Sequence, residues 1–215
     1  MKIVKVLSMV GLVGIGGVGA VGVMSLSSHQ GSGPGIEALP VAYASAAKNY
    51  DVDAVHSGAV FKITHAGASP FYGLFTGIGG TMTIDTQNPG ASSLEVTIDT
   101  TKIVTGNNNR DDHLRSGDFF NVRQFPTSTF KSTSVKAGQG GAMQVTGDLT
   151  LLGKTLPVTA TLTPTGQGAF RNTQRAGFEA SFSFNRSDFG MTMYVQEGVL
   201  SDRVDMTVFI QAIEK

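Results

Sequence analysis

Apolar and polar residues alternate most clearly between Met143 and Thr163, and this alternation predicts a β-hairpin. Around a turn at Gly153-Lys154, every second position is apolar: Met143, Val145, Leu149 and Leu151 before it, then Leu156, Val158, Ala160 and Leu162 after it. Successive side chains of a strand point to opposite faces, so each strand has one apolar and one threonine-rich face. Gly147 interrupts the apolar series, and we expect it to leave space on that face.

The same period of two recurs from Tyr50 to the C-terminus and predicts about eight strands in one β domain. Its apolar positions include Phe61, Ile63, His65, Phe75, Met82, Ile84, Leu94, Val96, Ile98, Phe130, Phe178, Ala180, Phe182, Phe184, Val204, Met206, Val208 and Ile210. Turn residues such as Asn88-Pro89-Gly90 separate the segments. Many short strands with turns between them indicate an antiparallel sandwich or barrel.

One segment, residues 109–117, departs from this period and predicts a short helix of about two turns. Asn109 has the side chain of a helix N-cap, Asp111 and Asp112 follow in the first turn, and Arg115 and Gly117 stand at the end. We expect ion pairs among residues 110–115 to hold this helix over one end of the domain.

The N-terminus differs from the rest of the chain and predicts export. Lys2 and Lys5 precede the uncharged residues 6–28, and small-residue cleavage sequences follow within 42–46. We therefore divide the chain into a signal peptide or N-terminal anchor with its linker, residues 1–47, and a β domain, residues 48–215. Residues 6–28 would anchor the protein to the membrane if they are not removed. In either case we expect a periplasmic or secreted protein.

Charge and cysteine content exclude several classes of function. Lys and Arg number 16, as do Asp and Glu, so the charge balance gives no indication of the basic surface that nucleic acid binding usually needs. The chain has no cysteine, which excludes disulfides, a thiol nucleophile and a cysteine-ligated zinc site.

The apolar faces have two interpretations that periodicity cannot separate. In a sandwich they form a packed core, whereas a closed barrel of eight strands is either filled by its side chains or holds one small ligand. Apolar strand faces are packed core far more often than they line a binding site, so the pattern alone favours a core.

Four segments resemble the YceI-like family of exported bacterial proteins. They are DVDAVHSGAVFKITHAGASPFYGLF (51–75), RDDHLRSGDFFNVRQFPTSTFKSTSV (110–135), GDLTLLGKTLPVT (147–159) and RAGFEASFSFNRSDFG (175–190). The resemblance implies an eight-stranded, antiparallel, lipocalin-like barrel whose apolar lumen holds a polyisoprenoid or another long-chain lipid, including a quinone or a fatty amide. It also implies a homodimer, which nothing in the strand pattern indicates.

Together, the pattern and the resemblance predict a set of residues that line the lumen and bind the ligand. They are Phe61, Ile63, His65, Phe75, Met82, Ile84, Val96, Ile98, Phe130, Val145, Leu149, Val158, Ala160, Phe182, Met206 and Val208. The first hypothesis is therefore an exported lipid-binding protein, and the alternative is a non-catalytic structural or stress-associated barrel with a packed interior. We expect no cofactor.

The histidines offer little support for an enzyme. His65 shares the apolar face of its strand and is interpreted as a core histidine or a residue that touches a ligand head group. His56 lies at the entrance of that strand and either contacts a head group or has an exposed or capping role. No G-x-S-x-G motif is present, and His56, His65 and His113 lack the i,i+4 spacing of helical metal ligands. A hydrolase or metalloenzyme is the least favoured hypothesis.

Overall fold

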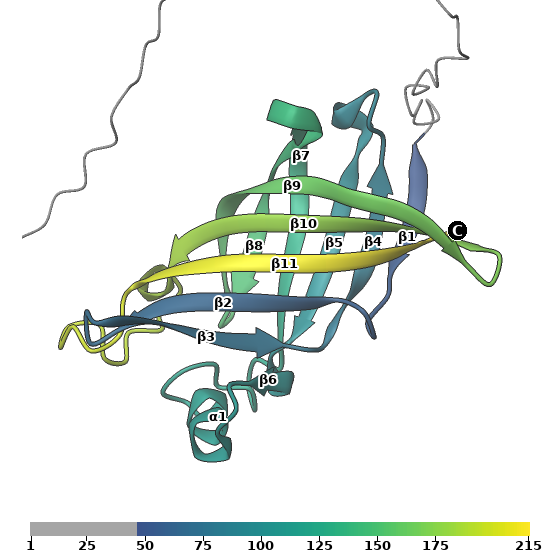
Figure 1. Cartoon of the computed structure of the whole chain (residues 1–215). Coiled ribbons are helices and arrows are strands. Elements are labelled where there is room, and N and C mark those ends of the chain that lie inside the picture. Colours follow the sequence, from purple (N-terminus) through teal and green to yellow (C-terminus); the bar gives the residue numbers. More distant parts are fainter. Residues whose placement is uncertain (1–46) are drawn as a thin grey trace, which may run out of the picture. The chain divides into compact units, whose positions relative to one another are not determined.

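Residues 47–215, the part of the chain that the computed structural model describes, form eleven strands and one α-helix (Figure 1). The strands are β1 (Lys48–Val52), β2 (Gly58–His65), β3 (Ser69–Phe75), β4 (Ile78–Ile84), β5 (Ser93–Asp99), β6 (Ile103–Val104), β7 (Thr127–Ala137), β8 (Met143–Leu151), β9 (Lys154–Phe170), β10 (Thr173–Asn185) and β11 (Arg203–Glu214). The helix is α1 (Asn108–Arg115), and four short 3₁₀ turns are η1 (Pro89–Ala91), η2 (Thr100–Lys102), η3 (Gln139–Gly141) and η4 (Arg186–Phe189).

The predicted signal peptide or anchor and most of its linker lie in residues 1–46, outside the described residues. Within residues 47–215, no helix has the length and apolar character that a membrane-spanning helix needs.

Eight strands close into an antiparallel barrel, which resolves the choice between sandwich and barrel. In the order β1, β4, β5, β7, β8, β9, β10 and β11, each strand pairs with the next, and β1 pairs with β11 to complete the ring. Three of these strands continue beyond a short break: β1 as β2, β4 as β3, and β5 as β6. Strand β2 pairs with β11 and with β3, and β3 pairs with β6. The predicted count of about eight strands is confirmed, with three of the eight interrupted.

The predicted hairpin is formed by β8 and β9, with Met143 opposite Leu162 and Leu151 opposite Lys154. Its two-residue turn consists of Leu152 and Gly153, whose φ angles of 52° and 74° are those of a type I′ turn. The predicted turn was therefore one residue too late. The alternation is confirmed, because the apolar positions of β8 are buried and the positions between them are more exposed.

The expectation that Gly147 leaves space in the lumen is wrong. A Cβ atom at Gly147 would overlap the ring of Phe130 and approach the carbonyl oxygen of Lys131 to 2.5 Å. The aromatic ring from the neighbouring strand β7 thus covers the glycine, and the space that a larger side chain would fill is already occupied.

One end of the barrel is closed by packed side chains. Tyr50 of β1 and Phe178 of β10 meet there edge to face, with ring centroids 6.0 Å apart. Met82 and Ile84 of β4 are 2% and 4% exposed in the same core. This end of the interior is therefore an ordinary core.

Helix α1 is present, but its N-cap lies two residues before the predicted one. Asn107, rather than Asn109, is the N-cap, and its side-chain oxygen accepts a hydrogen bond from the backbone N–H of Arg110 at 3.1 Å. Arg115 attaches the helix to the barrel by donating to the carbonyl oxygens of Thr101 and Ile103 at 2.9 and 3.0 Å. It also pairs with Asp112 at 2.9 Å, within the helix, as the prediction of ion pairs requires.

Candidate functional site

A cavity of about 210 Å³ lies at the end of the barrel near α1, opposite the packed end; we call it the mouth cavity. Strand residues supply most of its wall, and α1, the segment after it and the segment after β10 supply the rest. Its apolar lining consists of Phe61, Ile63, Phe71, Phe75, Ile98, Leu114, Phe119, Phe120, Leu149, Leu151, Phe182, Phe184, Met191, Leu200, Val204 and Met206. Such a surface favours an apolar guest.

A second cavity of about 60 Å³, the inner cavity, continues the lumen between β5, β7, β8, β9, β10 and β11. Its lining is also apolar apart from Ser128 and Thr129. The Ser128 hydroxyl is satisfied, because it donates to the carbonyl oxygen of Thr150 at 2.8 Å. Four residues border both cavities: Ile98, Ser128, Leu149 and Phe182.

The structure places most of the predicted lining residues on these two cavities. The mouth cavity is bordered by Phe61, Ile63, His65, Phe75, Ile98, Leu149, Phe182 and Met206. The inner cavity is bordered by Val96, Ile98, Phe130, Val145, Leu149, Val158, Ala160, Phe182 and Val208. Met82 and Ile84 border neither, since they belong to the packed end of the barrel.

Several lining residues were missed by the sequence prediction for two different reasons. Phe119, Phe120, Met191 and Leu200 lie in segments without strand periodicity, so no pattern marked them. Phe184 and Val204 lie on predicted apolar faces and were omitted only from the list of binding residues.

Arg186 is a buried charge at the wall of the mouth cavity and is 3% exposed. Its guanidinium donates to four backbone carbonyls, those of Met191, Met193, Leu200 and Ser201, at 2.9 to 3.3 Å. Burial lowers the pKa of Arg186 from its usual range, and the charge of Asp202 opposes this effect. Arg186 thus holds residues 191–201 in place beside the cavity.

Arg110 of α1 contributes a second guanidinium at the mouth. Its Cζ lies 4.6 Å from the centre of the Phe71 ring, a cation–π contact. Its Nε donates to the hydroxyl of Thr105 and its Nη2 to the Thr105 carbonyl, both at 2.8 Å. The side chain is exposed and therefore accessible to a ligand head group at the mouth.

The interpretation of His65 as a core histidine is wrong, because the residue is exposed and borders the mouth cavity. The lining of the mouth cavity therefore contains three basic residues, His65, Arg110 and Arg186, and no carboxylate. This arrangement favours a head group that accepts hydrogen bonds.

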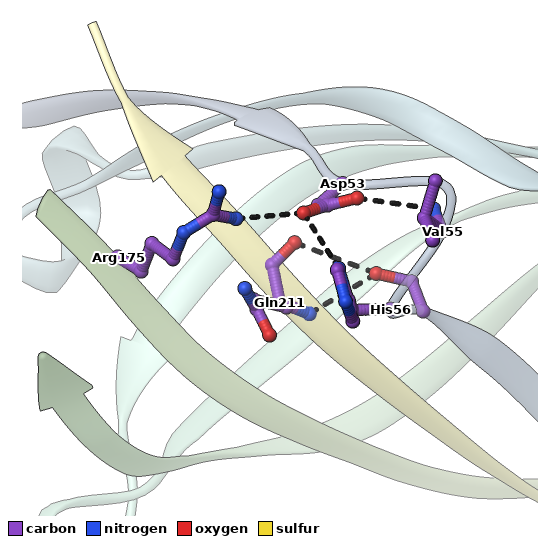
Figure 2. A network of polar contacts seen from close by, with 6 residues as sticks. Asp53, Val55, His56, Arg175 and Gln211 are labelled. Carbon is purple, nitrogen blue, oxygen red and sulfur yellow. Dashed lines mark hydrogen bonds and ion pairs between the residues drawn. The ribbon is translucent and has the colours of Figure 1, made fainter. Parts of the chain in front are cut away.

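A polar network lies outside the lumen, at the break between β1 and β2 (Figure 2). The Asp53 carboxylate accepts a hydrogen bond from Arg175 of β10 at 2.7 Å and another from the backbone N–H of Val55 at 3.0 Å, and lies 2.9 Å from His56 Nδ1. These contacts, that with His56 first, lower the pKa of Asp53 to about 2, against the opposing effect of burial. His56 borders neither lumen cavity.

The described residues do not form a metal site or a catalytic triad around their histidines. Among residues 47–215, no three His, Cys, Asp or Glu side chains are grouped as metal ligands would be. His113 pairs with Asp118 at 2.9 Å, and no serine or threonine hydroxyl joins that pair or the pair of His56 and Asp53.

Comparison with known proteins identifies relatives of this barrel. A family model for the YceI-like domain matches residues 50–212. A UPF0312 protein of Pseudomonas aeruginosa (strain LESB58) is 41% identical over 181 residues, which cover 83% of this chain and 93% of that protein.

Solved structures share the same fold. Burkholderia cenocepacia BcnA superimposes with a TM-score of 0.68 at 23% identity, over 74% of this chain and 98% of that chain. A polyisoprenoid binding domain from Saccharophagus degradans, implicated in plant cell wall breakdown, gives a TM-score of 0.57 at 16% identity, over 77% and 98%. Identities this low support the fold alone.

Proposed function

The chain belongs to the YceI-like domain family, and we propose that it is an exported protein that binds a polyisoprenoid-type or similar long-chain lipid in its barrel. The observation that carries this proposal is the mouth cavity, which is lined by apolar side chains and continues toward the inner cavity. The fold shared with the polyisoprenoid binding domain of S. degradans supports the choice of ligand class.

Burial of apolar surface is the main favourable contribution to lipid binding in this lumen. Burial of a dozen methylene groups contributes roughly 10 kcal/mol at about 0.8 kcal/mol each. Association and the ordering of a flexible chain offset a large part of this gain. Burial of the tail is therefore the main favourable term, and binding requires no polar contact along the tail.

The polar groups of the lumen lie where a head group would be. His65 and Arg110 are exposed at the mouth, whereas the inner cavity has no ionisable residue in its lining. We expect the apolar tail to point inward and the head group to stay near Arg110. A hydrogen-bond acceptor such as a hydroxyl, a quinone carbonyl or an amide suits this position.

This arrangement supports a binding protein and not an enzyme. A hydrolase needs a nucleophile and a base within hydrogen-bonding distance of each other and of the substrate. At the mouth of this lumen, the guanidinium of Arg186 donates four hydrogen bonds to backbone carbonyls, and that of Arg110 donates two to Thr105. Sequestration or transport of the lipid is the function that such a site performs.

Titration of the purified protein with farnesol tests the proposal. The variant Ala160→Asp places a charge in the wall of the inner cavity, and the matched control Thr159→Asp places the same charge on the neighbouring, exposed position. We expect the control to bind like the wild type and Ala160→Asp to lose at least about tenfold in affinity, because a buried, unpaired charge is costly.

The alternative, a barrel with a packed interior, makes the opposite prediction for the same titration. Wild-type protein that binds neither farnesol nor a long-chain quinone would support the alternative. In that case Ala160→Asp would lower only the melting temperature.

Export is a second part of the proposal and rests on residues 1–47 of the sequence. Expression of the full chain in a Gram-negative host, followed by fractionation, tests it. We expect the protein in the periplasm or the medium, in a form shortened near residues 44–47 if the signal is cleaved. Full-length protein in the membrane fraction would indicate the anchor, and protein confined to the cytoplasm would contradict export.

A further inference from the structure

One large aromatic side chain lies at the border that the two lumen cavities share. Of the four residues that border both cavities, Phe182 is the largest and the only aromatic one. Phe182 is half-buried and comes from β10, where Met206 of β11 lies opposite it. Its ring stacks on that of Phe184, with centroids 6.1 Å apart and an interplanar angle of 23°.

The strand that carries Phe182 is paired on one side only. The ladder between β9 and β10 ends at the pair Thr161 and Ser181, one residue before Phe182. Residues 182–185 of β10 continue to pair with β11 alone. A strand segment held by one neighbour resists displacement less than one held by two, so we expect the Phe182 ring to be displaced at a lower cost than the rings of the packed end.

The volumes of the two cavities limit the length of the lipid tail that each can hold. A dry apolar cavity of about 150 Å³ holds benzene in a protein interior. The mouth cavity, at about 210 Å³, therefore accommodates a tail segment of roughly eight carbons. The inner cavity, at about 60 Å³, is too small for a separate guest but large enough to continue such a tail.

We infer that Phe182 is the specificity-determining residue for tail length: its ring separates the mouth cavity from the inner cavity, and a tail that extends into both must displace it. This inference rests on the proposed function and specifies the ligand class further. Short prenyl or acyl tails bind without movement of the ring. Longer tails bind with a cost that depends on the residue at position 182.

Two neighbouring aromatic residues allow a matched comparison. Phe184 has the same side chain, lies two residues further on the same face of β10, and borders the mouth cavity but not the inner one. Phe182→Ala joins the cavities, whereas Phe184→Ala enlarges the mouth cavity alone. Ala160→Phe has the reverse effect, because Ala160 borders only the inner cavity and a larger side chain fills it.

The experiment is a calorimetric titration of each variant with geraniol (C10) and geranylgeraniol (C20), and the quantity compared is the ratio of the two affinities. We expect Phe182→Ala to raise the preference for the C20 chain by about tenfold, since about two more methylenes are buried without displacement of a ring. Phe184→Ala enlarges the mouth cavity but keeps the Phe182 ring between the cavities, so it should raise the ratio clearly less than Phe182→Ala does, and Ala160→Phe should lower the ratio. If Phe182→Ala fails to fold, Phe182→Leu replaces it, and it should raise the preference for the C20 chain by a smaller factor.

The outcomes separate this inference from the function on which it rests. Binding of C10 and C20 with a ratio unchanged in Phe182→Ala, or changed equally in Phe184→Ala, would overturn the role of Phe182 and leave the lipid-binding function intact. Wild-type protein that binds neither prenol would contradict both.

Discussion

At the scale of single residues, Asp53 links the break between β1 and β2 to β10 through Arg175. Its pKa is lowered to about 2 from 3.8, so the folded protein favours the carboxylate more than the unfolded chain does. A lowered carboxyl pKa stabilises the fold fully above about pH 4, and this contribution is lost as the pH falls from about 4 to 2.

The first prediction follows from that shift. Asp53→Asn should reduce the free energy of unfolding at pH 7 by about 2 kcal/mol, and the difference from wild type should shrink toward zero near pH 2. Urea unfolding at pH 7, 4 and 2 measures the loss at pH 7 and its decrease toward pH 2. The control is Asp51→Asn, which removes an exposed ion pair with Lys215. It should lower the free energy of unfolding by less than about 0.5 kcal/mol at each of these pH values. Equal losses in the two variants would show that the network adds no stability.

Gly147 supports a second prediction at this scale. Gly147→Ala should lower the stability by about 1–3 kcal/mol, because its Cβ overlaps the ring of Phe130 in a filled interior. Gly166→Ala is the control, since no atom lies within 4 Å of a Cβ there and its φ angle suits other residues. Thermal unfolding distinguishes them: a stable Gly147→Ala variant would mean that Phe130 moves aside at little cost.

The same residues show what the sequence could and could not predict about the site. Period-two alternation assigned Val145 and Ala160 to the inner face, because the direction of a strand side chain depends only on its position. It could not show that Phe130 covers Gly147 or that Met82 belongs to the packed end. Those facts depend on which strands are neighbours and on how far along the barrel each residue lies.

At the scale of elements, α1 shows that three neighbouring residues of one type can each serve as the helix N-cap. Residues 107, 108 and 109 are all Asn, and only the backbone determines which one is the cap. Asn107 has an extended backbone, and its side chain accepts from the N–H of Arg110. Sequence alone identified the helix and its type but not its first residue, because three consecutive caps of equal quality leave the start undetermined.

A third prediction uses this run of asparagines. Asn107→Ala should destabilise the protein by about 1 kcal/mol through loss of the N-cap, whereas Asn109→Ala, inside the helix, should be neutral or slightly stabilising. Hydrogen exchange of the first turn of α1 is the direct measurement, with faster exchange expected only in Asn107→Ala. Faster exchange in Asn109→Ala instead would place the helix start where the sequence suggested it.

The strands show a similar limit of sequence analysis. Alternation predicted the eight lines of the barrel, but not that three of them are interrupted. At the break after Val52, Asp53 contacts Val55 and His56 nearby in the sequence, but its other partner, Arg175, is 122 residues away. Contacts over such a separation leave no local pattern.

At the scale of the whole barrel, one end is packed and the other contains an apolar cavity with basic residues at its mouth. The packed end stabilises the barrel, while the mouth keeps apolar surface that no side chain of the described residues covers. The segments that border the mouth, α1 and residues 191–201, are held by Arg115 and Arg186 through backbone carbonyls. On the proposed function, stability and ligand binding therefore belong to opposite ends.

Analysis of the lipid that accompanies the natively purified protein tests the lipid-binding function most directly. The protein is expressed from its full chain, purified without detergent, extracted with organic solvent and analysed by mass spectrometry beside its Ala160→Asp variant. We predict about one long-chain lipid of polyisoprenoid type per wild-type molecule and a clear reduction in the folded variant. Wild-type protein that yields no long-chain lipid, and that takes up none when incubated with prenol or quinone, would contradict the account.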